Sequence, residues 1–311
     1  MTAAPAEGAV PSRPFAAQAG AAQAGAAMLL GSAACFGLNI PFARLAAAQG
    51  VAGPGLVVFR VLVMLLVLGA VAIAGGVSLR VAARQRGQLL ALALVSALLG
   101  LAYISSVSFI PVGIAVLIFY TFPLLIVAAT PFVDGARLSI WQIAACLISF
   151  AGISLAVGPS LGALDWRGLA LAGLASCCAV AQFFLASRAP GGGGVTTIFW
   201  IHATILPVAI VIAAAFGGVA QVANFEAAAT PIVFTTIFYL VGVALQFRGL
   251  GQSTAARAGL IYCLEPIVAV AFAAWLIGER LTPAQYAGGV LVLLAVGVSM
   301  ITSGAPTRAS A

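Results

Sequence analysis

Residues 115–142 read AVLIFYTFPLLIVAATPFVDGARLSIWQ, and residues 258–285 read AGLIYCLEPIVAVAFAAWLIGERLTPAQ. At a constant offset of 143 residues the two stretches align without a gap. The coinciding residues include Pro123 with Pro266, Gly135 with Gly278, Arg137 with Arg280, Leu138 with Leu281 and Gln142 with Gln285. A similar offset of 142 places Gly31 on Gly173, Cys35 on Cys177 and Arg60 on His202. The chain is therefore built from an internal repeat.

The composition excludes an ordinary soluble domain. Charged residues make up 6% of the chain, against about 25% in soluble domains. Apolar residues make up 64%, and the mean hydropathy is +1.22. Six acids and thirteen arginines cannot cover a fold of 311 residues with charge. The apolar surface must therefore face lipid.

Glycine, proline and charge divide the chain into ten apolar spans of about 20 residues, the length that a bilayer requires. They lie near 25–47, 54–75, 87–107, 111–132, 140–158, 166–187, 195–217, 230–249, 254–277 and 283–303. Residues 1–24 are predicted to be a disordered leader and residues 304–311 a tail. The prediction is an all-α, polytopic membrane protein.

The repeats are expected at 25–158 and 166–303, with five spans in each. Because five is odd, the second repeat must sit upside down relative to the first. Inverted repeats of this kind are the architecture of many secondary transporters. The sequence thus predicts a transporter.

The arginines predict the orientation. With both termini in the cytoplasm, most of them fall on the inner side, as the positive-inside rule expects. The inner set is Arg13, Arg80, Arg84, Arg86, Arg137, Arg188, Arg248 and Arg308. The chain has no lysine, and its arginines are mostly scattered, so we expect no nucleic-acid partner. The predicted location is the cell (inner) membrane.

Several strings resemble the EamA-type domains of the drug/metabolite transporter superfamily. GERLTPAQYAGG (278–289) after LEP (264–266) is similar to the end of one such domain, and GARLSIWQ (135–142) after FP (122–123) to the end of another. GSAACFGLNIPFAR (31–44) resembles the first helix of the family. The resemblance covers about 25–303. It implies ten helices, cytoplasmic termini and export of metabolites such as amino acids.

Glu265 is the sharpest candidate for the chemistry. It falls near the centre of the ninth span, where an acid costs about 2.5–3.5 kcal/mol on insertion scales. Such a residue faces a polar cavity or a partner, and could carry a proton or bind an amine. Tyr262 lies on the same helical face. The alternative is a structural acid that bonds backbone groups freed by Pro266.

Pro123 and Pro266 interrupt their spans at corresponding places in the two repeats. Each removes a helical hydrogen bond and kinks the chain. Paired interruptions of this kind indicate a binding site at the repeat interface, whereas the alternative is that they serve packing alone.

Arg60 and His202 occupy related depths in the two repeats. Arg60 could hold a substrate carboxylate or extend to the interface, and His202 could relay protons or be a packed residue. Weaker candidates for a cavity or a helix interface are Asn39, Tyr103, Tyr120, Tyr239, Gln182 and Gln246.

The predicted function is secondary transport of small metabolites, either amino acids or related amphipathic compounds. It would use alternating access with proton coupling or facilitated efflux. The alternatives are a phosphorylated-sugar or nucleotide-sugar exchanger, a membrane enzyme, and a scaffold or sensor. No phosphate-binding loop motif and no metal-ligand spacing occur, so we expect no cofactor and no metal.

Overall fold

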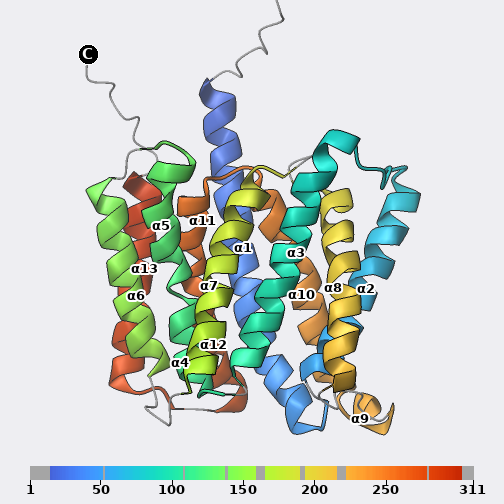
Figure 1. The fold of residues 1–311 in the computed structure, drawn as a ribbon. Helices are drawn as coiled ribbons and strands as arrows, with labels where there is room; N and C mark the ends of the chain where they lie inside the picture. Colours follow the sequence, from blue (N-terminus) through green and yellow to red (C-terminus); the bar gives the residue numbers. More distant parts are fainter. Residues whose placement is uncertain are drawn as a thin grey trace, which may run out of the picture.

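A computed structural model of the chain describes residues 15–302 except 52, 108, 137–138, 159–164, 190–192, 216–221 and 279. This part of the chain is helical throughout and contains no strand (Figure 1). The helices are α1 (Phe15–Ala48), α2 (Gly53–Ala74), α3 (Ala83–Ser106), α4 (Val112–Phe119), α5 (Phe122–Val133), α6 (Ile140–Val157), α7 (Trp166–Ser187), α8 (Val195–Ala215), α9 (Val222–Ala227), α10 (Ala229–Leu250), α11 (Ala255–Tyr262), α12 (Leu264–Ile277) and α13 (Pro283–Thr302).

Within the described ranges, nine segments are long and apolar enough to cross a membrane, and Pro283–Val298 forms a shorter apolar helix. Two of the nine are pairs of half-helices, α4 with α5 and α11 with α12. The predicted all-helical, polytopic class is confirmed. Helix α1 begins ten residues earlier than predicted, since the Ala- and Gln-rich stretch 15–24 favours a helix. The rest of the predicted leader and the tail lie outside the described residues.

The two prolines break their spans and do not merely kink them. A proline ring clashes with the carbonyl group four residues earlier, and proline has no N–H to donate. Helix α4 ends at Phe119, four residues before Pro123, and α11 ends at Tyr262, four residues before Pro266. In each case a new half-helix starts within three residues of the break.

The second repeat is inverted relative to the first. In Figure 1, α1 runs down from one end of the bundle, whereas α7, the first helix of the second repeat, runs up toward that end. We call the end at which α1 begins and α13 ends the terminal face. The broken spans meet at Gly259, where an added Cβ would lie 3.1 Å from Ile126 and 3.5 Å from Pro123. The breaks of both repeats therefore lie side by side.

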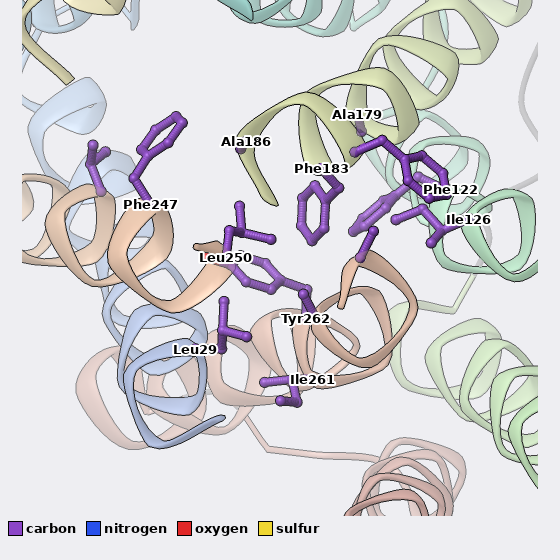
Figure 2. Close-up of a cluster of buried hydrophobic side chains, with 14 of the residues drawn as sticks. Leu29, Phe122, Ile126, Ala179, Phe183, Ala186, Phe247, Leu250, Ile261 and Tyr262 are labelled. Atoms are coloured by element: carbon purple, nitrogen blue, oxygen red, sulfur yellow. The ribbon is translucent and has the colours of Figure 1, made fainter. Parts of the chain in front are cut away.

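Aromatic side chains fill the space around these breaks. Figure 2 shows Phe122, Phe183 and Tyr262 turned toward one another at the centre of the bundle. The rings of Phe122 and Phe183 lie 5.2 Å apart, and those of Phe183 and Tyr262 also lie 5.2 Å apart, edge to face. This arrangement joins α5 of the first repeat to α7 and α11 of the second.

Candidate functional site

A cavity of about 400 Å³ lies between the two repeats, beside the helix breaks. It is walled by side chains of α1, α2 and α3 from the first repeat and of α7, α8 and α10 from the second, with the broken helices at its centre. The polar side chains that line it are Arg60, Ser96, Tyr103, Gln182, His202, Tyr239, Gln246, Tyr262 and Glu265. Seven of these nine are site residues that the sequence predicted.

Arg60 is the one arginine among the described lining residues, and it lies about two turns into α2. Its guanidinium carbon sits 4.4 Å from the ring centre of Tyr239, which is a cation–π contact. Its Nε atom is buried and has no hydrogen-bond partner among the described residues. The guanidinium group is therefore positioned by an aromatic face and retains donor capacity for a ligand.

His202 and Tyr239 form a hydrogen-bonded pair next to Arg60. Nδ1 of His202 lies 2.8 Å from the carbonyl oxygen of Ile198, which can only accept, so Nδ1 carries the hydrogen. Nε2 lies 2.9 Å from the Tyr239 hydroxyl, and in the neutral imidazole it accepts from that hydroxyl. Tyr239 thus fixes both functional candidates: its ring contacts Arg60, and its hydroxyl contacts His202.

Glu265 lies in the first turn of α12, immediately after the break. The Tyr120 hydroxyl donates a hydrogen bond to its carboxyl group. Tyr120 is buried and is not among the lining residues, so it positions the acid from behind the cavity wall. Glu265 is the one acid that lines the cavity among the described residues, and no ion pair joins it to Arg60.

Tyr262 ends α11 and links three helices across the break. Ser32 Oγ donates to the carbonyl oxygen of Gly242 at 2.7 Å, and the Tyr262 hydroxyl donates to Ser32 Oγ at 2.6 Å. Because Ser32 belongs to α1 and Gly242 to α10, this chain of hydrogen bonds fixes the end of α11 against both. Tyr262 is therefore both a cavity residue and an anchor of the break.

Asn39 is the one predicted binding residue whose side chain is fully engaged elsewhere. Its Nδ2 donates to the Thr235 carbonyl oxygen at 2.9 Å, and Thr235 Oγ1 donates back to its Oδ1 at 3.0 Å. It does not line the cavity. This reciprocal pair joins α1 to α10, so the structure places Asn39 in helix packing.

Ser96 and Gln182 line the cavity although the sequence did not commit them to the site. Gln182 Nε2 donates to Ser96 Oγ at 2.8 Å, which connects α7 to α3 across the repeats. The signal was present, since Ser96 shares a helical face with Tyr103 and an amide within an apolar span needs a partner. The aromatic walls formed by Phe36, Phe119, Phe122, Phe183 and Phe247 gave no such signal.

The arrangement suits a ligand with two opposite charges and an apolar body. A substrate carboxylate can bind the guanidinium of Arg60, and an ammonium group can bind the carboxylate of Glu265. The two protein charges do not neutralise each other, and aromatic rings cover the walls between them. Pockets of this kind bind small molecules with a few oriented polar groups among apolar contacts.

Comparison with known proteins gives the family. The model of the EamA-like transporter family matches twice, at residues 23–158 and at residues 166–301. No curated protein matches the chain. One solved crystal structure aligns over 91% of this chain and 98% of its own, with a TM-score of 0.67 and 18% sequence identity, which is a likeness of fold. With two matched repeats that together span most of its length, the chain belongs to the EamA-like transporter family and is a multi-pass membrane transporter of the drug/metabolite type.

Proposed function

We propose that the protein is a secondary transporter that exports small zwitterionic, amphipathic metabolites, of which amino acids are the first candidates. The observation that carries this proposal is the separation of charge in the central cavity. Arg60 and Glu265 line the same space without forming an ion pair. A buried charge without a partner is costly, and a zwitterionic substrate would supply the missing partner to each of them.

The same observation disfavours a phosphorylated-sugar or nucleotide-sugar exchanger. A dianionic substrate needs several cations around it, and Arg60 is the one cationic side chain among the described lining residues. A scaffold or sensor would have no need of a central space, so the cavity of about 400 Å³ supports transport over that role. His202 gives no support to a metal-assisted enzyme with Glu265, because its ring nitrogens face Ile198 and Tyr239.

The mechanism that we propose is alternating access, with the broken helices as moving parts. The cavity is lined by the beginning of α2 and by the ends of α3 and α8, all of which lie away from the terminal face. At the terminal face the repeats are joined, since Gln88 Nε2 donates to the Arg188 carbonyl oxygen at 2.6 Å and Arg188 pairs with Asp134.

The distribution of arginine supports placing the terminal face in the cytoplasm of the cell that carries the protein in its inner membrane. Among the described residues, Arg80, Arg84, Arg86, Arg188 and Arg248 lie at that face, whereas Arg44, Arg167 and Arg280 lie at the other. In this orientation the cavity extends toward the outside, and the conformation is the one that releases an exported substrate.

The test is transport by purified protein in proteoliposomes, measured as counterflow of labelled amino acids under an imposed pH gradient. We expect wild type to exchange at least one zwitterionic, apolar amino acid. We expect Glu265→Gln to lose at least tenfold in rate, because the neutral amide cannot pair with an ammonium group or release a proton. The matched control is Glu226→Gln, an exposed acid on α9 that does not line the cavity.

Three outcomes decide the proposal. If Glu265→Gln fails while Glu226→Gln equals wild type, Glu265 acts in transport. If transport by wild type responds to the pH gradient and the residual transport of Glu265→Gln does not, the carboxyl group carries the coupled proton. If Glu265→Gln matches wild type, Glu265 is structural and the proposal of a paired zwitterion fails.

A further inference from the structure

A second cavity, of about 810 Å³, lies at the terminal face on the side of the bundle formed by α3 and α8. Its walls come from the loop between α2 and α3 and from these two helices. They include Arg80, Arg86, Leu89, Leu90, Trp200 and Thr204. None of its lining residues lines the central cavity, so it is a separate site.

The loop that carries the arginines is fastened to α8. The indole Nε1 of Trp200 donates to the Leu79 carbonyl oxygen at 2.9 Å, and Thr196 Oγ1 donates to the Ser78 carbonyl oxygen at 3.0 Å. Two side chains of the second repeat thus hold the backbone of a loop of the first. The backbone next to Arg80 is therefore fixed, which reduces the entropy lost when a ligand binds there.

The site is cationic and has no counter-charge of its own. Among the described residues no acid forms an ion pair with Arg80, Arg84 or Arg86. Helix α3 begins here with no acidic residue in its first turn and no side-chain cap. Arg86 uses Nε to donate to the Val81 carbonyl oxygen at 3.2 Å, which leaves its terminal nitrogens for a ligand.

The same site continues into an apolar ridge. Leu90 and Leu94 are separated by one helical turn on α3, and their side chains are 55% and 53% exposed. Trp200 is 43% exposed beside them, as is typical of tryptophan at the level of lipid headgroups. A ligand that satisfies both parts must carry an anionic head and a long apolar chain.

We propose that this cavity is a binding site for an anionic phospholipid of the inner leaflet. The phosphate group binds between Arg80 and Arg86, near the free N–H groups at the start of α3. An acyl chain runs along the ridge of Leu90 and Leu94. The bound lipid bridges α3 of the first repeat and α8 of the second.

The experiment is native mass spectrometry of the delipidated protein in detergent, titrated with phosphatidylglycerol or with phosphatidylcholine of the same chains. We expect phosphatidylglycerol to be retained with at least tenfold preference. For the double variant Arg80→Ala/Arg86→Ala we expect binding about 30-fold weaker, because each basic residue near a membrane surface contributes about fivefold. The matched control is Arg84→Ala, which removes a charge from the same loop but not from the cavity wall.

Further arms distinguish the lipid from other causes. Arg80→Lys/Arg86→Lys keeps the charge and should retain most of the binding. If it binds while the alanine variant does not, the alanine result reflects lost charge and not misfolding. The proposal is overturned if Arg84→Ala loses as much affinity as the double variant, or if both lipids bind alike. It is also overturned if inorganic phosphate alone, at the lipid concentration, competes the lipid off. None of these readings depends on transport.

Discussion

At the scale of single residues, Tyr239 holds the cationic end of the central cavity. Its ring lies under the Arg60 guanidinium group, and its hydroxyl donates to His202. These two contacts can be separated by mutation, because phenylalanine keeps the ring and removes the hydroxyl. A cation–π contact contributes about 2 kcal/mol when it is desolvated, whereas a buried acceptor left unpaired costs about 1–3 kcal/mol.

We therefore predict different effects for Tyr239→Phe and Tyr239→Leu. The phenylalanine variant should keep the substrate KM within about threefold of wild type, but should melt at a lower temperature because Nε2 of His202 loses its donor. The leucine variant should in addition raise the KM about tenfold, because Arg60 loses the surface that orients it. Counterflow kinetics and thermal unfolding in detergent measure the two effects. Equal KM values for both variants would show that the ring does not position Arg60.

At the scale of helices, α6 and α13 cross at two glycines. An added Cβ on Gly152 would lie 2.7 Å from the carbonyl oxygen of Gly288, and one on Gly288 would overlap with the carbonyl oxygen of Gly152. Both neighbours are backbone atoms of a helix and cannot turn aside. Small residues at such crossings allow close approach of backbones in a membrane, where van der Waals packing drives association.

We predict that Gly288→Ala destabilises the protein by about 1–3 kcal/mol, the usual cost of overpacking. The melting temperature in detergent should fall accordingly. Gly297→Ala on the same helix is the control, because a Cβ there meets nothing within 4 Å, and it should melt at or slightly above the wild-type temperature. If the two variants melt alike, the crossing is looser than the structure indicates.

At the scale of the whole molecule, contacts between the repeats close the terminal face. Arg188 at the end of α7 pairs with Asp134 at the end of α5, and also donates to the Val133 carbonyl oxygen at 3.0 Å. The other printed ion pair, between Asp165 and Arg167, lies within a single repeat at the opposite face. Only the first pair can therefore bias the equilibrium between conformations open to opposite sides.

We predict that Asp134→Asn shifts that equilibrium toward opening at the terminal face. A surface ion pair contributes about 1 kcal/mol at most, so the open population should rise up to about fivefold. Hydrogen exchange of the ends of α5 and α7 should increase accordingly. Asp165→Asn should leave exchange at the terminal face unchanged. Equal exchange in both variants would assign the closure to apolar packing alone.

Much of this architecture could be read from the sequence, because its causes are local. Apolar runs of about 20 residues determine the spans, and a count of five per repeat determines the inversion. Pro123 and Pro266 determine the helix breaks, since each excludes the hydrogen bond to the residue four positions earlier. The position of Glu265 beside one of those breaks follows from the same argument.

Only the tertiary structure decided which polar side chains share the cavity. Asn39 and Ser96 both lie in apolar spans, yet Asn39 pairs with Thr235 on α10 while Ser96 lines the cavity with Gln182. The rotation of each helix about its axis is set by packing against helices far away in the sequence. Because lipid and protein interior are both apolar, hydrophobic patterning cannot report that rotation in a membrane as it does in water.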